Sequence, residues 1–290
     1  MSEEILKALM QLFAIIAKQD EGVELKERDY VVNFLTQQLN DEAVKEYIRL
    51  FDEHAGLLDK EDNAENDEEK GKRKLTSVKD SVRILGICKK INKTLTQKQK
   101  IVVLVRLYEL INADRKFTEQ RMAIINTVAE VFKLTKEEIS DIENFVIKNS
   151  PEELDIPSIL TIHDKPFTGK NCKHIGTEAL DGYIYILQIK SEDLYFLRYT
   201  GNEDIYLNGL PIHNRRIYLF ASGSSLKLPK GKPVYYTDVV SHFLADSTSI
   251  RISYKVENVG FQFKTGDIGL RNISFSEGHG KLVGIMGASG

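Results

Sequence analysis

The sequence has few cysteines, no proline in its first half and no long apolar run. Its two cysteines, Cys88 and Cys172, exclude a disulfide scaffold and a four-cysteine zinc site. No apolar stretch approaches the ~18 residues of a membrane-spanning helix, and the N-terminus lacks a basic-then-apolar signal sequence. A formal net charge of -3 over 290 residues excludes a chain dominated by phosphate-binding lysine and arginine. We therefore expect a cytoplasmic protein that does not bind nucleic acid.

The residues that interrupt helices are unevenly distributed. All six prolines and fifteen of the nineteen glycines lie after residue 150, together with nine of the twelve tyrosines. Proline and glycine disfavour helices, whereas tyrosine favours strands. The composition therefore predicts an all-helical domain over 1–150 and a β-rich part after it.

Apolar residues of the first half recur at helical spacing. About seven helices are predicted, the first with its apolar face at 5–16 and the others roughly at 27–39, 41–55, 77–92, 97–111, 119–132 and 136–148. Thr96, Thr118 and Thr135 stand where N-cap residues are expected. The segment 59–74 has one apolar residue and is predicted to be a mobile loop.

The helical half contains an internal repeat. The segment Leu9–Asp20 aligns with Val103–Asp114, and each is an apolar helix that ends in aspartate. Three residues after each aspartate comes an apolar residue, Val23 or Phe117, and then another helix begins. This order resembles the tellurite-resistance TerB-like family of helical domains, over about residues 1–148.

The TerB-like resemblance implies that the two acidic turns gather a divalent cation. Hard cations prefer carboxylate and carbonyl oxygens, and the candidate metal ligands are Asp20, Glu24, Glu27 and Asp114. In the second repeat, however, Arg121 stands where Glu27 stands in the first. The alternative is structural: the aspartates end helices, Glu27 lies in a favourable first helical turn, and Arg121 pairs with Glu27 or Asp20. We favour the structural interpretation.

From about residue 156 the apolar period changes to two. Short strands rich in aromatic and branched residues are predicted at 183–190, 194–199, 204–207, 216–220 and 225–228. Turn residues separate them, with no long helix between. This spacing favours a β-sandwich or barrel over 151–250.

One part of the β-rich region resembles a known domain. Residues 205–212, with the turn Asn208-Gly209, and then 218–228 resemble the closing part of a forkhead-associated domain. The resemblance implies phosphothreonine binding through loop arginine, serine and asparagine side chains. Asn208 fits that pattern, and its alternative role is simply to form the turn.

The rest of the forkhead-associated pattern is incomplete. No arginine follows Gly176, and no Ser-x-x-His motif comes after it. Arg198 is the candidate arginine, and with Arg215 and Arg216 it is a candidate for a local anion site. We therefore expect a β-sandwich that does not bind phosphopeptides strongly, with Arg198 and Asn208 as the phosphopeptide candidates.

The last forty residues have a pattern of their own. Two alternating strands are followed by a predicted buried strand, Lys281–Met286, and by the turn Gly287-Ala-Ser-Gly290. This turn is the first half of a P-loop, in which backbone N–H groups wrap phosphates. With Phe263 and the run Leu-Arg-Asn-Ile-Ser-Phe, residues 252–290 resemble the start of an ABC-type ATPase domain. The resemblance implies that Phe263 stacks on adenine and that Gly287, Ser289 and Gly290 begin the phosphate loop.

The patterns together predict a multidomain α plus β chain: a TerB-like helical bundle over 1–150, a forkhead-associated-like β-sandwich over 151–250 and the first strands of a P-loop ATPase over 251–290. We expect the N-terminal regulatory and interaction region of an ABC transporter ATP-binding subunit, cut inside the phosphate loop. Such a fragment is expected to be inactive and to have no bound cofactor, and much of 255–290 to be poorly ordered or packed opportunistically.

The full-length parent is expected to hydrolyse ATP with Mg²⁺, to dimerise and to dock on a transmembrane subunit at the cytoplasmic face of the membrane. A protein partner for the β domain is a further expectation. The alternative is a stand-alone stress-response module that senses a divalent metal or a phosphopeptide. A hydrolase is disfavoured, because the six histidines are scattered and none lies in a triad context.

Overall fold

The protein is described by a computed structural model that covers residues 3–19, 23–57, 73–166, 168–244, 253–278, 283–284 and 286–287. The predicted loop at 59–74 lies almost wholly outside these residues. The chain divides into two compact units, Met1–Asp238 and Val239–Gly290, and each is described by itself.

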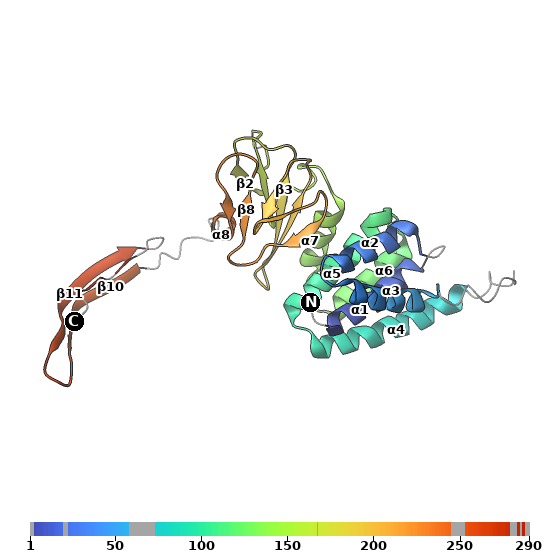
Figure 1. The fold of residues 1–290 in the computed structure, drawn as a ribbon, viewed down its shortest axis with the longest axis horizontal. Helices are drawn as coiled ribbons and strands as arrows, with labels where there is room; N and C mark the ends of the chain where they lie inside the picture. The colour runs from blue at the N-terminus through green and yellow to red at the C-terminus, as the bar shows by residue number, and fades with distance from the viewer. Residues whose placement is uncertain are drawn as a thin grey trace. The chain divides into compact units, whose positions relative to one another are not determined.

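Within the described residues, seven helices form the first region of the larger unit (Figure 1). They are α1 (Glu3–Ala17), α2 (Leu25–Thr36), α3 (Asp41–Ala55), α4 (Arg73–Thr94), α5 (Gln97–Asp114), α6 (Glu119–Val131) and α7 (Lys136–Ile147). The hydroxyl groups of Thr96, Thr118 and Thr135 accept the N–H of the third helical residue of α5, α6 and α7. The predicted helices and their caps are confirmed.

The core of the helical region centres on α1 and α5. Ten of the fifteen residues of α1 are buried, and α5 is buried on most of its circumference, as its nearly continuous apolar sequence predicts. The Phe13 ring of α1 meets Tyr30 and Phe34 of α2 edge-on, at centroid distances of 5.9 and 6.0 Å. Full burial of each large apolar side chain contributes about 1.5–3 kcal/mol, so these helices stabilise the region mainly through packing.

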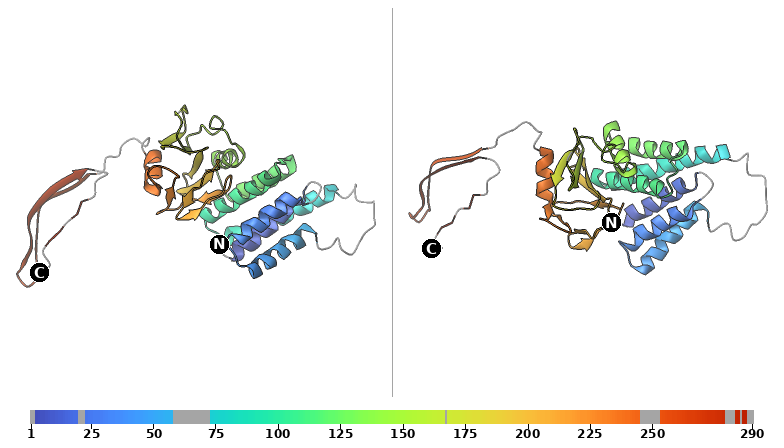
Figure 2. Two further views of the ribbon diagram at one scale, coloured as in Figure 1. Left: turned by 45° about the horizontal axis from the view of Figure 1, so that its top comes forward. Right: turned by 90° about the horizontal axis from the view of Figure 1, so that it is seen from above.

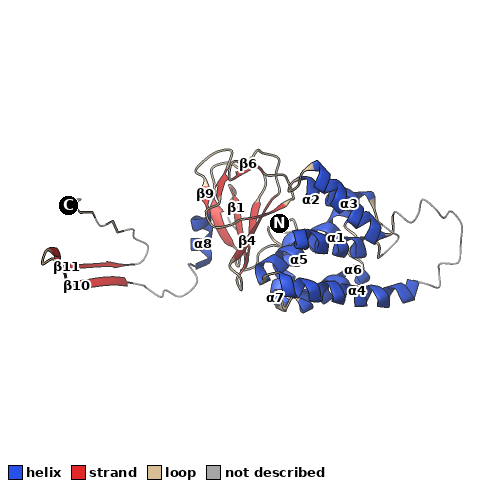
Figure 3. Ribbon diagram, turned by 60° about the horizontal axis from the view of Figure 1, so that its bottom comes forward, coloured by secondary structure: helices blue, strands red, loops and turns tan. Residues whose placement is uncertain are grey.

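Two sheets follow the helices (Figures 1 and 3). The first has the order β2-β1-β3-β4-β7, with β1 and β2 parallel and the other pairs antiparallel. Its strands are β1 (Ile159–His163), β2 (Lys173–Gly176), β3 (Ile184–Ile189), β4 (Leu194–Tyr199) and β7 (Ile217–Leu219). The second has the order β6-β5-β8-β9, with β5 (Tyr206–Leu207), β6 (Leu210–Pro211), β8 (Ser225–Lys227) and β9 (Val234–Tyr235).

All five predicted strands are present, as β3, β4, β5, β7 and β8. The Asn208-Gly209 turn joins β5 to β6, and both residues have a positive φ, 53° and 82°. A two-residue hairpin turn needs this left-handed backbone, and asparagine and glycine adopt it at low cost.

A helix that the sequence did not predict follows β9 in the chain. Residues Tyr236–Leu244 form α8, which Figure 2 shows in orange. Val239 and Phe243, four residues apart, are its buried face, while the Asp238 carboxylate accepts the N–H of Tyr235 at 2.9 Å. A helix of two and a half turns repeats its apolar spacing too few times to be recognised in the sequence, and it begins beside two tyrosines, which favour strands.

The second unit contains an antiparallel hairpin of β10 (Ser253–Gln262) and β11 (Ile268–Gly278). Residues 253–278 are thus regular rather than poorly ordered, because the long strands satisfy each other's backbone hydrogen bonds. Nearly all their side chains are exposed. Of the predicted strand at 281–286, only Val283, Gly284 and Met286 are described, and they have no regular structure.

Among the described helices, none combines the length and the apolar character that crossing a membrane requires.

Candidate functional site

The two repeats of the helical region meet around a buried arginine. Arg121 of α6 lies with its Nη2 3.0 Å from Glu27 Oε1 and its Nη1 2.6 Å from Asp114 Oδ2. All three side chains are at most 1% exposed. Glu27 comes from the first turn of α2, where its other oxygen accepts the N–H of Glu24 at 3.0 Å. The ion pair between Arg121 and Glu27, predicted as the structural alternative, is confirmed.

The cluster holds two carboxylates and one guanidinium away from water. Burial raises the pKa of Glu27 to about 7, although the Glu24 N–H and the charge of Arg121 act in the opposite direction. The proximity of Asp114 adds to the rise. The cluster therefore has one matched charge pair and a second carboxylate that gains from holding a proton.

The four predicted metal ligands are distributed as follows. Glu27 and Asp114 bind Arg121, while Glu24 forms an ion pair with Lys116. Asp20 lies outside the described residues. In the part of the chain that the structure describes, no group of three or more His, Cys, Asp or Glu side chains is placed to hold a metal ion. Metal binding stays a prediction.

Asn208, the candidate in the forkhead-associated pattern, organises a turn. Its Oδ1 accepts the N–H of Ser225 at 2.9 Å, and its Nδ2 donates to Ser224 Oγ at 3.4 Å. These bonds tie the β5–β6 turn to the start of β8. Asn208 is not among the residues around Arg198, so the structure does not bring the two phosphopeptide candidates into one pocket.

Arg198 joins the strands to the helices. It lies on β4, is 2% exposed, and donates to the carbonyl oxygens of Val146, at 3.1 Å, and Lys148. These carbonyls belong to the end of α7, where the helix dipole favours a cation. Its guanidinium also lies 5.4 Å from the Phe145 ring centroid and 5.5 Å from that of Tyr185. Burial lowers the pKa of Arg198 to about 10 and the charge of Arg215 adds to the fall, while Tyr185 and the Glu109 carboxylate act in the opposite direction.

A second joint connects α5 to β7. Arg106 Nη1 donates to Glu109 Oε2 at 2.5 Å and to the Ile217 carbonyl at 3.0 Å. Glu109 Oε1 accepts the Ile217 N–H at 3.1 Å, and its Oε2 accepts the Tyr30 hydroxyl at 3.1 Å. One ion pair on a helix thus binds both backbone groups of one strand residue.

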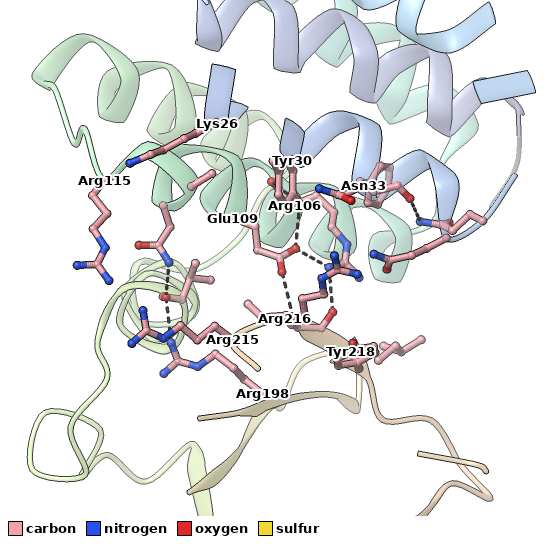
Figure 4. Close-up of a pocket in the computed structure, with 18 of the residues that line it drawn as sticks. Lys26, Tyr30, Asn33, Arg106, Glu109, Arg115, Arg198, Arg215, Arg216 and Tyr218 are labelled. Atoms are coloured by element: carbon pink, nitrogen blue, oxygen red, sulfur yellow. Dashed lines mark hydrogen bonds and ion pairs between the residues drawn. The ribbon is translucent and has the colours of Figure 1, made fainter. Parts of the chain in front are cut away.

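Between these two joints lies a pocket of about 590 Å³ (Figure 4). Six cationic side chains and a single carboxylate, that of Glu109, line it. The cations are Lys26, Arg106, Arg115, Arg198, Arg215 and Arg216. The structure therefore brings together Arg198, Arg215 and Arg216, which the sequence had indicated as a local anion site. The contributions of α2 and α5 were not predicted.

The residues of the ATPase pattern lie in the second unit. Phe263 follows β10, is 53% exposed and meets Phe261 edge-on at a centroid distance of 4.9 Å. Gly287 is described and a Cβ added there would meet no atom within 4 Å, whereas Ser289 and Gly290 lie outside the described residues. The predicted nucleotide contacts of these residues stay predictions.

The seven helices pack around a buried cluster of charged side chains within the described residues. The family model of the tellurite resistance protein TerB matches residues 6–144, so a TerB domain spans these residues. No curated protein and no solved structure gives a significant match to the chain. The strand-rich region and the hairpin follow the matched residues.

Proposed function

We propose that the chain is a regulatory and partner-docking region of an ABC-type ATPase. The observation that carries the proposal is the pair of charged joints, Arg198 to the end of α7 and Arg106–Glu109 to Ile217. They hold the TerB domain and the β domain, which we take as a forkhead-associated-like sandwich, in one compact unit. A ligand or partner bound by either domain then acts on both.

The ATPase part of the proposal rests on residues 252–290. The hairpin β10–β11 lies where the two alternating strands of the pattern fall, and the Phe263 ring is exposed for stacking. Phe263 would contact adenine, and Gly287, Ser289 and Gly290 the phosphates of ATP, with Mg²⁺ as the second cofactor. A transmembrane partner, dimerisation and a place at the cytoplasmic face of the membrane belong to the same proposal.

The test begins with the open reading frame beyond the codon for Gly290. We expect Gly-Lys-Ser or Gly-Lys-Thr within three residues, since a P-loop requires them. Any other sequence would rule out the proposed ATPase domain. With the motif present, the full-length protein is compared with a variant that lacks residues 1–244. Deletion is expected to change the ATP hydrolysis rate severalfold, and an unchanged rate would rule out a regulatory role.

A second candidate function is phosphothreonine binding by the β domain, favoured by the Asn208 turn. Asn208→Gly keeps the positive φ of 53° while removing the side chain. Asn258→Gly, at a φ of 48° in the hairpin, is the matched control. Selection from a phosphothreonine peptide library is expected for the wild type and the control and to be lost in Asn208→Gly. No selection by the wild type would end this candidate.

A further inference from the structure

The pocket between the helices and the strands has the dimensions of a small-molecule site. Its volume of about 590 Å³ falls within the roughly 300–1,000 Å³ typical of ligand pockets. Its walls come from α2, α5 and the end of α7 on one side and from β4, β7 and the residues before β7 on the other. A ligand there would contact both domains at once.

The charge of the lining is strongly positive in a chain whose net charge is -3. Glu109 is the lone carboxylate of the lining, and its two oxygens are occupied by Arg106, Tyr30 and the Ile217 N–H. Five cations of the pocket thus have no carboxylate partner in the described part of the chain. Positive charges that converge in a cleft raise the local concentration of anions.

Two of these arginines have a backbone conformation that arginine rarely adopts. Arg115 ends α5 at a φ of 62°, and Arg215 precedes β7 at a φ of 64°. The left-handed region costs an ordinary residue about 1–2 kcal/mol, and glycine or asparagine would adopt it at less cost. The side chains of Arg115 and Arg215 both line the pocket.

The buried arginine of the pocket, Arg198, has an N–H group without an acceptor among the described groups. Arg198 is 2% exposed and lines the pocket, and the group in question is its Nε–H. Its other bonds go to the carbonyls of Val146 and Lys148 and to Asn149 Oδ1, so Arg198 has no ion-pair partner among the described residues. Arg215 lies near enough to oppose the charge of Arg198. An anion between these two arginines would relieve the repulsion and supply the missing counter-charge.

The pocket is not cationic throughout. Figure 4 shows Lys26, Arg115 and Arg215 toward one end, Asn33 and Tyr218 toward the other, and Arg106 and Arg216 between them. The amide of Asn33 has both a donor and an acceptor, and the phenol of Tyr218 combines an aromatic face with a hydroxyl. Such groups bind a flat, polar ring better than a second phosphate.

We propose that this pocket binds a nucleoside di- or triphosphate, with the phosphates between Arg115, Arg198 and Arg215 and the base at the Asn33 end. Several negative charges in a compact group match the cations of the lining. The bound nucleotide holds the TerB domain against the β domain. This site is separate from the hairpin residues proposed above to contact ATP.

The test is isothermal titration of the purified chain without divalent metal. The probes are ATP, GTP, pyrophosphate and inorganic phosphate. Arg115→Asn/Arg215→Asn removes two charges while keeping residues that tolerate a positive φ. The control, Lys133→Asn, makes the same exchange at a φ of 60° outside the pocket. We expect a nucleotide to bind the wild type and the control alike, and the double variant at least tenfold more weakly.

Four results would overturn the proposal. The first is that neither ATP nor GTP binds at millimolar concentration. The second and third are that the double variant binds as tightly as the wild type, or that the Lys133→Asn control loses as much affinity as the double variant. The fourth is that pyrophosphate binds as tightly as a nucleotide, which would show that the base makes no contribution. Phe263→Ala separates the two nucleotide proposals. If binding is lost in Phe263→Ala and kept in the double variant, the nucleotide binds at the hairpin, which supports the ATPase proposal and contradicts this one.

Discussion

The two regions of the larger unit each bury an arginine, and they neutralise it in different ways. Arg121, inside the helical region, binds a carboxylate from each repeat. Arg198, where strands meet helices, binds backbone carbonyls and aromatic rings. Both are nearly inaccessible to water. The first charge is matched within the protein, whereas the second is only solvated by dipoles.

The difference indicates which region stabilises the fold and which is built to bind. A buried ion pair that is complete gives a fixed geometry and has no need of a ligand. An arginine held by carbonyls beside a pocket with further cations keeps its attraction for anions. The TerB domain thus contains a closed cluster, and its border with the β domain contains an open one.

Removal of the matched arginine should have the largest effect. Arg121→Met leaves Glu27 and Asp114 buried without a cation, and we expect a loss of about 3–5 kcal/mol in the free energy of unfolding. Urea denaturation measures it. Arg121→Met combined with Glu27→Gln and Asp114→Asn should regain most of the loss. A loss below about 1 kcal/mol in the single variant would show that the cluster is not matched as described.

Removal of the open arginine should cost less. Arg198→Met keeps the contact with Phe145 and Tyr185 but removes the donor to the Lys148 carbonyl, which costs about 1–3 kcal/mol. The Val146 carbonyl still accepts the Asn112 amide at 3.1 Å. No carboxylate loses its partner. The same urea experiment applies, and a loss as large as that of Arg121→Met would break the comparison.

The matched cluster should also make stability depend on pH. The pKa of Glu27 rises from 4.5 to about 7 on folding, so between these values the folded protein holds a proton that the unfolded chain has lost. Its contribution to stability therefore falls as pH rises, by up to about 1.4 kcal/mol per pH unit. Glu27→Gln lacks this titration.

Urea denaturation of both proteins from pH 4.5 to 7.5 measures the effect. The free energy of unfolding of Glu27→Gln, relative to the wild type, should increase through this window. A constant difference would mean that Glu27 keeps an ordinary pKa beside Arg121.

The smallest effect is expected from the arginines with a positive φ. Arg215→Asn relieves backbone strain and the repulsion of Arg198, so without ligand the protein should gain about 0.5–1 kcal/mol. Lys133→Asn relieves the strain alone and should gain less. Thermal unfolding of the two variants in phosphate-free buffer compares them, and a clear loss in Arg215→Asn would show that its side chain stabilises the empty protein.

Local signals in the sequence predicted the elements well. The threonine caps of α5, α6 and α7 and the Asn208-Gly209 turn are short-range devices, and each is found where its residues place it. An ion pair of Arg121 with Glu27 or Asp20 was also expected from the sequence, because aligning the two repeats puts an arginine opposite a glutamate, and the structure contains the pair with Glu27.

The joint between the domains was not predictable in the same way. Arg106 and Glu109 lie three residues apart in the apolar segment 101–111 of α5 and bind the backbone of Ile217. A backbone group more than one hundred residues away cannot be identified as the partner from the sequence, because the backbone groups of different residues are alike. Arg198 was singled out as a phosphate ligand, and its bonds to the α7 carbonyls depend equally on tertiary structure.

The central claim is that the charge of Arg198, unlike that of Arg121, is neutralised by a bound nucleotide. Its most direct test is the gain in unfolding free energy when the tighter of ATP and GTP is added to the wild type, Lys133→Asn and Arg198→Met at about one hundred times the wild-type dissociation constant. We expect a gain of about 2.7 kcal/mol in the first two and less than a third of it in Arg198→Met. An equal gain in all three proteins would contradict the claim.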